Sequence, residues 1–423
     1  MAMEEKFRGA AKYFKHAIVA AMFLLTSLSF SSCKEENNVE ATQRNFTEQI
    51  KLVIDAALDS IKRTDPQFPG GLAMKVIYPG GEVFYQTGFT NAVTSATHFR
   101  AASNTKTFTS TAILLLHQRG KLNINHKISD TIPGTQMTYL PNDANYAVPF
   151  KSEITILQLL QHRAGIFDIS NDPIPDTVSA PVPYKGDWYA EYIKAQNPNH
   201  TFTFDELVGV VSTCGLYYFR PGADYHYSNT GYSMLGKIIE RVSGKAYSDF
   251  IMDEVIKPMG MTSSSMPSLG TENTLPVPFV PGYVHSNEGI TNVTVSNISL
   301  NVAEGNLITT LDDLALFVRK TMRGEGVLSP NTVYLTMLNC IPTKPGTLGQ
   351  YGCGVHYINQ LGYGHTGAHE GYLSQMTHDP ATDVTMVIYT NGWDLREYIN
   401  SIVVTMNHMQ DALYKVKRIV LTK

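Results

Sequence analysis

Apolar positions recur at regular intervals along most of the chain and predict its elements. In 46–63 they return every three or four residues, which predicts an amphipathic helix. The stretches 71–78 and 82–88 flank a Pro-Gly-Gly sequence and read as two strands joined by a tight turn. From residue 351 onward, short apolar runs alternate with Gly, Asn and Asp-Pro, and 395–414 closes the chain with a helical pattern. We therefore expect strands near both chain ends.

The pattern between these ends is mostly helical. Thr107–Arg119 is largely apolar, contains neither Gly nor Pro, and stops at Gly120, which is typical of a helix end. Further helices are expected at 155–162, 205–213, 230–243 and 247–256. Strands at both ends and helices between them predict an α+β fold, in which one sheet carries a mostly helical insert at about 103–290.

The first residues have the composition of an export signal. Basic residues precede residue 16, and Ala17–Phe30 is an uncharged, largely apolar stretch too short to span a bilayer comfortably. Two serines and then Cys33 follow, which resembles a bacterial lipobox. We expect 1–32 to be a signal peptide and Cys33 to carry a lipid anchor to the membrane. A plain cleaved signal and an uncleaved anchor are the alternatives.

This signal predicts an exported protein, located in the periplasm or at the cell surface. Residues 33–45 are polar and predict a flexible tether to a domain at 46–420. If the compartment is oxidising, Cys340 and Cys353 either form a disulfide or remain buried thiols.

Composition narrows the classes of protein further. Of the 423 residues, 43% are hydrophobic and 17% are charged, which predicts a large core and excludes global disorder. There are 33 basic and 37 acidic residues, for a net charge of −4, and no long basic run. Nucleic acid is therefore not an expected partner.

A serine and a lysine lie one turn apart at a predicted helix start. In Ser103-Asn104-Thr105-Lys106, the two side chains share one helix face. A serine hydroxyl becomes a good nucleophile only when a base takes its proton, and lysine is such a base when burial lowers its pKa. Taken alone, the motif is also explained by a capping serine followed by a surface lysine.

Two later motifs supply further polar groups. Tyr227-Ser228-Asn229 offers a phenol and an amide before a predicted helix, and a phenol can relay a proton. His365-Thr366-Gly367 lies in a strand-like segment between glycines, where a substrate backbone can approach. Taken alone, they are also explained as an aromatic turn with a helix cap and as a buried edge histidine.

Together and in this order, the three motifs resemble those of serine β-lactamases and penicillin-binding proteins. The likeness is greatest to the class C β-lactamases and D-alanyl-D-alanine carboxypeptidases, whose second motif is Y-x-N. The stretches 159–166, 227–244, 256–261 and 304–317 are also similar to that family. The resemblance implies a β-lactamase-like fold, with an antiparallel sheet flanked by N- and C-terminal helices.

The resemblance also implies roles for individual residues. Ser103 would be the acylated nucleophile, Lys106 its activating partner and Tyr227 the proton shuttle. The backbone N–H groups of Ser103 and Ala368 would form the oxyanion hole. The residues that would bind substrate are Asn229, His365, Thr366 and Gly367.

One position departs from the β-lactamase pattern. Class C β-lactamases have lysine where His365 stands, and imidazole attracts a carboxylate less than an ammonium does near pH 7. The resemblance therefore favours an acyl-enzyme hydrolase of an amide or ester, with D-alanyl-D-alanine peptides as the first substrate class. A β-lactamase, a small-ester hydrolase and a non-catalytic cell-wall-binding lipoprotein are the alternatives.

Other kinds of site find no support in the sequence. It contains no G-x-S-x-G, no H-E-x-x-H and no phosphate-binding glycine loop. We expect no metal and no organic cofactor. Ile169–Pro198 contains five prolines and predicts a long surface loop, which we expect to border the cleft and shape specificity.

Overall fold

The computed structural model describes residues 46–344, 349–396 and 399–422. The chain divides into two units, Met1–Leu52 and Val53–Lys423. Within the first unit, the structure describes residues 46–52, which are helical. This helix ends at residue 64, in the second unit. The predicted signal peptide, the predicted lipid site Cys33 and the predicted tether lie outside the described residues. No helix in the described part is both long and apolar enough to cross a membrane.

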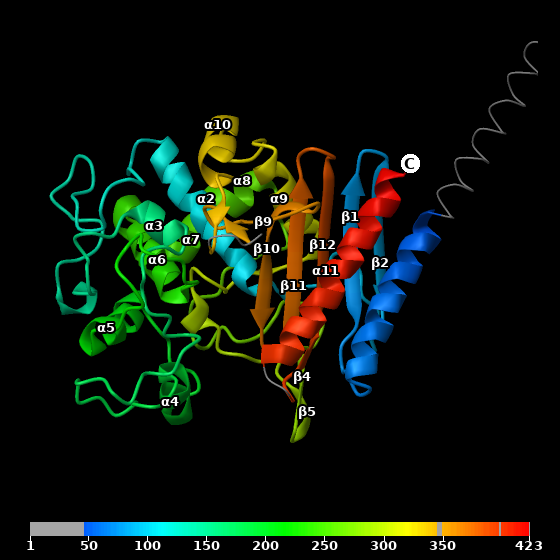
Figure 1. Ribbon diagram of the computed structural model, residues 1–423, viewed down its shortest axis with the longest axis horizontal. Helices are drawn as coiled ribbons and strands as arrows, with labels where there is room; N and C mark the ends of the chain where they lie inside the picture. The colour runs from blue at the N-terminus through cyan, green and yellow to red at the C-terminus, as the bar shows by residue number, and fades with distance from the viewer. Residues whose placement is uncertain (1–45, 345–348, 397–398, 423) are drawn as a thin grey trace, which may run out of the picture. The chain divides into compact units, whose positions relative to one another are not determined.

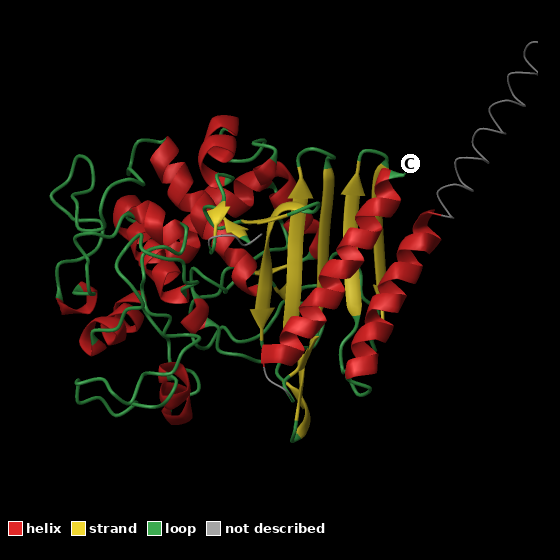
Figure 2. Ribbon diagram, in the orientation of Figure 1, coloured by secondary structure: helices red, strands yellow, loops and turns green. Residues whose placement is uncertain are grey.

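An eight-stranded antiparallel sheet is the central layer of the larger unit (Figures 1 and 2). Its strands, in spatial order, are β2 (Gly81–Thr87), β1 (Leu72–Tyr78), β12 (Val384–Thr390), β11 (Tyr372–Asp379), β10 (Gly362–His369), β9 (His356–Ile358), β8 (Gln350–Tyr351) and β7 (Ile341–Pro342). In the pairing of β1 with β12, Leu72 lies opposite Thr390. The prediction that strands from both chain ends form one sheet is confirmed.

Helices cover both faces of this sheet. Helix α11 (Ile399–Leu421) lies across β11 and β12 on one face, and α9 (Leu311–Met322) contacts β1, β11 and β12 on the other (Figure 1). Helix α11 starts at Ile399, later than predicted, because the chain after strand β13 (Gly392–Asp394) continues its pairing: Leu395 N–H donates to the His285 carbonyl at 2.8 Å. It also extends further, since apolar residues such as Val416 remain buried in its last turns.

The residues between β2 and β7 form the helical part of the fold. Its helices are η1 (Ala102–Asn104), α2 (Thr105–Gln118), η2 (Ala144–Tyr146), α3 (Ile156–Leu160), α4 (Tyr189–Gln196), α5 (Phe204–Cys214), α6 (Asn229–Ser243), α7 (Tyr247–Ile251), η3 (Met252–Ile256), α8 (Lys257–Met259), η4 (Ser299–Asn301), α9, α10 (Pro330–Thr332) and η5 (Val333–Met337). Two small sheets accompany them, one of β3 (Phe99–Arg100) and β6 (Ile308–Thr309), the other of β13, β4 (Tyr283–Ser286) and β5 (Gly289–Asn292).

Helix α2 runs through the core, and its polar side chains find partners there. Thr107 Oγ1 donates to the Gly354 carbonyl at 2.7 Å, and Thr109 Oγ1 donates to the Ala303 carbonyl at 2.6 Å. On its apolar side, Phe108 stacks on Phe317 of α9, with ring centroids 3.5 Å apart. Because its hydroxyls are satisfied, this helix can be buried along nearly its whole length.

The predicted loop Ile169–Pro198 is not entirely a loop. It contains α4, whose Tyr189 and Ala190 are buried. The Tyr189 hydroxyl donates to Glu206 Oε1 at 2.7 Å. A tertiary contact therefore stabilises a short helix that the proline content alone did not predict.

Candidate active site

Ser103 and Lys106 lie where a short 3-10 turn meets helix α2. Ser103 is in η1, and Lys106 is in the first turn of α2. Lys106 Nζ donates to Ser103 Oγ at 3.2 Å, and the lysine side chain is fully buried. Ala102, just before the serine, has φ of +50°, a backbone conformation that residues with a side chain rarely adopt. The fold thus places an amine directly against the predicted nucleophile.

Tyr227 lies on the other side of this pair. It precedes Ser228, the residue whose hydroxyl caps helix α6 by accepting from Gly231 N–H. The ring centroid of Tyr227 lies 4.7 Å from Lys106 Nζ, and Tyr227 lines the same cavity as Ser103. Burial raises the pKa of Tyr227 well above its ordinary value. The phenol is therefore protonated at rest and able to donate.

A buried carboxylate completes the surroundings of the lysine. Lys106 Nζ lies 3.1 Å from Glu304 Oε2 and donates to the Glu304 carbonyl at 2.9 Å. Burial lowers the pKa of Lys106, while the charge and hydrogen bond of Glu304 act in the opposite direction. The sequence analysis did not single out Glu304, because it is 198 residues from Lys106 along the chain.

Asp168 is a second buried acid near the site. It accepts from the backbone N–H groups of Asn229 and Ser170, both at 3.1 Å, and from the Asn171 amide at 2.7 Å. Burial raises the pKa of Asp168 to about 6, against these hydrogen bonds. Asp168 thus ties the start of α6 to the segment that follows residue 168.

Strand β10 presents three residues to the site, of which His369 is the last. Thr366 and Ala368 line the cavity, whereas His365 is buried and does not. The Tyr351 hydroxyl lies 2.9 Å from His365 Nε2, and His365 Nδ1 lies 2.6 Å from the Thr366 carbonyl. Burial lowers the pKa of His365 well below its ordinary value, so its ring is neutral. Both ring nitrogens of this predicted binding residue are engaged inside the protein.

Two other histidines, His356 and His369, line the cavity instead. His356 of β9 lies with its ring centroid 4.7 Å from that of His365. Burial and the Lys106 charge lower the pKa of His356 to about 4. The period-two alternation of a strand would have placed His365 and Thr366 on opposite faces. No sequence signal marked His356.

These groups surround one cavity of about 400 Å³. Its wall includes Ser103, Tyr227, Asn229, Glu304, Thr366 and Ala368. The Asn229 Oδ1 atom is buried and has no hydrogen-bond partner among the described residues. Ser170 and Asn171 also line the cavity, so the first residues of the predicted loop 169–198 border it. The cavity thus brings together residues from all three sequence motifs.

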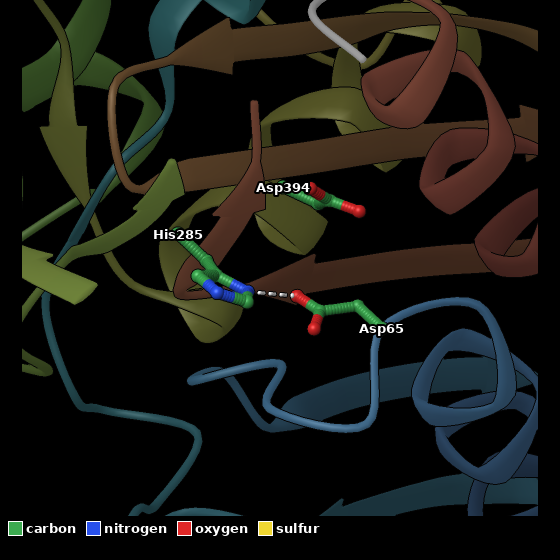
Figure 3. A group of neighbouring side chains, drawn as sticks. All are labelled: Asp65, His285 and Asp394. Atoms are coloured by element: carbon green, nitrogen blue, oxygen red, sulfur yellow. Dashed lines mark hydrogen bonds and ion pairs between the residues drawn. The ribbon is translucent and has the colours of Figure 1, made fainter. Parts of the chain in front are cut away.

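A second cluster of polar side chains has the spacing of a metal site. His285 Nδ1 lies 2.8 Å from Asp65 Oδ2, and Asp394 lies beside them (Figure 3). However, Arg396 donates to both oxygens of Asp394, at 2.9 and 2.8 Å, and lies 3.3 Å from Asp65. Since a guanidinium already balances the two carboxylates, we interpret the cluster as an ion-pair network that joins the segment at Asp65 to β4 and β13.

The cysteines in the described part of the chain are free thiols. Cys353 is buried, and Cys214 and Cys340 are partly buried. Cys340 Sγ lies 3.8 Å from the Val355 carbonyl, and Cys353 Sγ lies 3.7 Å from the Thr336 carbonyl. The sequence left open whether Cys340 and Cys353 form a disulfide or remain thiols, and in the structure they are thiols.

Comparison with protein families gives a match over most of the chain. The family described as Beta-lactamase matches residues 56–400. Among curated relatives, Protein flp of Staphylococcus aureus (strain NCTC 8325 / PS 47) is 32% identical over 219 residues, which are 49% of this chain and 37% of that protein. Penicillin-binding protein 4* of Bacillus subtilis (strain 168) is 29% identical over 194 residues, 44% of this chain and 36% of that protein. The chain therefore spans little more than a third of these relatives.

Solved structures share the fold at low sequence identity. The D-amino acid amidase from Ochrobactrum anthropi SV3, complexed with D-phenylalanine, has a TM-score of 0.68 and 22% identity, covering 88% of this chain and 99% of that one. The D-stereospecific amidohydrolase from Streptomyces sp. has a TM-score of 0.66 and 23% identity, covering 81% and 94%. These likenesses establish the architecture.

Proposed function

This chain belongs to the β-lactamase family of serine hydrolases, and we propose that it is exported and hydrolyses D-amino-acid amides or peptides through an acyl-enzyme on Ser103. Peptides that end in D-alanyl-D-alanine are the first substrate class. The observation that carries the proposal is the contact of buried Lys106 Nζ with Ser103 Oγ at 3.2 Å, at the wall of a cavity that Ser103 and Tyr227 both line.

The proposed acylation uses these three side chains in turn. Lys106, once it has lost its excess proton, takes the proton from Ser103 Oγ, and the oxygen's electron pair forms a bond to the substrate carbonyl carbon. The carbonyl π electrons move to oxygen, and in this scheme the N–H groups of Ser103 and Ala368 stabilise the charge. When the intermediate collapses, the C–N bond breaks and the leaving nitrogen receives the proton through the Tyr227 hydroxyl.

Deacylation runs the same steps with water as the nucleophile. Water loses a proton to the Lys106–Tyr227 pair, its oxygen bonds to the acyl carbon, and Ser103 Oγ leaves with that proton. The acid product departs, and both side chains return to their initial protonation. Water is the co-reactant, and with it the atoms and charges balance.

The cavity wall supports an amide substrate. Asn229 Oδ1, which has no partner among the described residues, is placed to accept a hydrogen bond from a substrate N–H. A terminal carboxylate would meet the Thr366 hydroxyl, since His365 is enclosed. The D-amino acid amidase and the D-stereospecific amidohydrolase with this fold are named for substrates of the same class.

Replacing the nucleophile tests the proposal. Ser103→Ala should abolish the covalent adduct that the native protein forms with a fluorophosphonate or a penicillin, because no other group takes its place. Intact-mass spectrometry measures the adduct. Ser60→Ala, which removes a hydroxyl that donates to the Ala56 carbonyl outside the cavity, is the control and should label normally. An adduct of undiminished yield on Ser103→Ala would refute the assignment.

A small-ester hydrolase is the second candidate. No lysine or arginine occurs among the described residues that line the cavity wall, so a neutral ester would lose little binding there compared with an anionic substrate. Release of D-alanine from D-Ala-D-Ala peptides, nitrocefin hydrolysis and p-nitrophenyl ester hydrolysis should be measured side by side. A higher kcat/KM for the ester than for the peptide would favour this candidate, and rapid nitrocefin turnover would favour a β-lactamase.

A further inference from the structure

The Lys106 ammonium has all of its hydrogen-bonding capacity in use. An ammonium carries three N–H groups. The three acceptors around Lys106 Nζ are Ser103 Oγ at 3.2 Å, the Glu304 carbonyl at 2.9 Å and Glu304 Oε2 at 3.1 Å. In this arrangement the nitrogen has no free lone pair, so Ser103 Oγ receives a hydrogen bond and cannot give up its proton to the lysine.

Glu304 is itself held firmly in place. Its side chain is 3% exposed, and its Oε1 atom accepts from Asn301 Nδ2 at 2.6 Å. Its other oxygen and its carbonyl both face Lys106. Among the described residues, Glu304 is the only acid in contact with Lys106 Nζ. The charge of Glu304 and its hydrogen bond favour the charged form of Lys106.

We propose that Glu304 keeps Lys106 protonated at rest and thereby sets the pH range in which Ser103 can be acylated. The inference rests on the proposed function, since it concerns the base in that reaction. Acylation then needs a prior step, in which one Lys106 N–H bond breaks and its proton leaves to water. The freed lone pair accepts the Ser103 proton. Glu304 is a positioning residue in this scheme, because it acts on Ser103 only through Lys106.

The other titratable groups around Lys106 cannot take over this role. Burial keeps His162, His356 and His365 neutral, and the same cause keeps Tyr227 and Tyr232 protonated. Asp168 attracts Lys106 electrostatically, but its oxygens accept hydrogen bonds from Asn229, Ser170 and Asn171. Glu304 is therefore the group whose removal should change the titration of the lysine most.

The direction of the effect follows from charge. Glu304→Gln keeps the shape of the side chain but removes the anion that stabilises the ammonium. Burial then dominates, and the pKa of Lys106 falls further. The amine becomes available at lower pH, so the acid limb of the acylation profile should move to lower pH by about one unit or more. At a pH well below the pKa of Lys106 in both proteins, the acylation rate relative to its plateau should be at least tenfold higher in Glu304→Gln than in the native protein. Glu304→Asp keeps the negative charge, so the acid limb of its acylation profile should lie at nearly the same pH as that of the native protein.

Two measurements test this inference. The first is the rate of Ser103 acylation by a penicillin or a p-nitrophenyl ester as a function of pH. The second is the titration of the Lys106 side chain by NMR with ¹³C-labelled lysine, assigned through Lys106→Met, which needs no substrate. Glu254→Gln is the matched control, because it removes the same charge from a surface pair with Arg119 and Lys245. It should leave both profiles unchanged.

The outcomes separate this inference from the proposed function. A native protein that forms no adduct with any probe contradicts the proposed function, and the NMR titration still decides whether Glu304 controls Lys106. An unchanged Lys106 titration in folded Glu304→Gln overturns the inference. If circular dichroism shows that this variant is unfolded, Asn301→Ala replaces it, because it removes the donor to Glu304 Oε1. The Lys106 titration should then move in the same direction by a smaller amount, and no movement overturns the inference.

Discussion

Gly367 allows β10 to approach the turn that carries Ser103. A Cβ atom at this position would lie 2.2 Å from the Ala101 carbonyl oxygen and 2.7 Å from Asn104 Nδ2. Both atoms belong to the segment next to the predicted nucleophile. Any side chain at 367 must therefore push the strand away from η1, and Ala368 would move away from Ser103 with it.

We predict that Gly367→Ala slows acylation of Ser103 by at least about tenfold and lowers stability by about 1–3 kcal/mol. Stopped-flow labelling and urea unfolding measure the two effects. Gly120→Ala is the control. It places alanine at a positive φ, +67°, which Gly367→Ala does not, but a Cβ there meets nothing within 4 Å. It should cost about 1 kcal/mol and leave labelling unchanged, and equal loss of labelling in both variants would contradict the argument.

At the residue scale, the sequence predicts contacts between residues that lie close together in a motif. The spacing of Ser103 and Lys106 on one helix turn was enough to predict their contact, which the structure contains. The contact of Glu304 with Lys106 depends on the pairing of β6 with β3, the strand just before the Ser103 turn. No local sequence pattern predicts that pairing. The roles of these residues in catalysis stay predictions until the variants are measured.

Between elements, the contact of α2 with α9 links the turn that carries Ser103 to the sheet. Phe108 and Phe317 stack with 11° between their ring planes, and both are completely buried. Helix α9 in turn packs on three central strands. The position of Ser103 relative to β10 therefore depends on an aromatic contact that includes no active-site residue.

Phe317→Ala should lower the free energy of unfolding by about 3–5 kcal/mol, because it leaves a cavity between the two helices. Urea unfolding followed by circular dichroism measures it, with an unchanged m value expected. Leu335→Ala, at a leucine that is 73% exposed, is the control and should stay within about 0.5 kcal/mol of the native protein. Equal losses in the two variants would argue against the packing interpretation.

Element types were largely predictable, and their ends less so. The helix at 46–63 and the strands on either side of Pro79-Gly80-Gly81 occur within a residue or two of their predicted limits. The helix has a strong period because it buries one face, and the Pro-Gly-Gly turn marks the ends of the two strands, although β1 is buried on both faces. Helix α4 and strand β13 were missed, since they are short and depend on tertiary partners such as Glu206 and β4.

For the whole molecule, the attachment to a membrane is the largest untested feature. We propose that Cys33 is lipidated after removal of 1–32. Cys33→Ser should then move the protein from the membrane fraction to the soluble fraction of the cells that make it, as judged by immunoblotting. Cys214→Ser, at a thiol within the folded part, should leave the distribution as it is. A Cys33→Ser protein that stays with the membrane would contradict lipid anchoring at this residue.

The pairing of β1 with β12 has a consequence for folding during synthesis on the ribosome. A ribosome releases the β1–β2 hairpin early, yet Leu72 finds its partner only after Thr390 has been made. At ordinary elongation rates this delay lasts roughly 15 to 60 s. Throughout that interval one edge of β1 has unpaired backbone N–H and C=O groups, which can pair with a strand of another chain. A chaperone or a translocation channel that shields that edge until synthesis ends would prevent such wrong pairing.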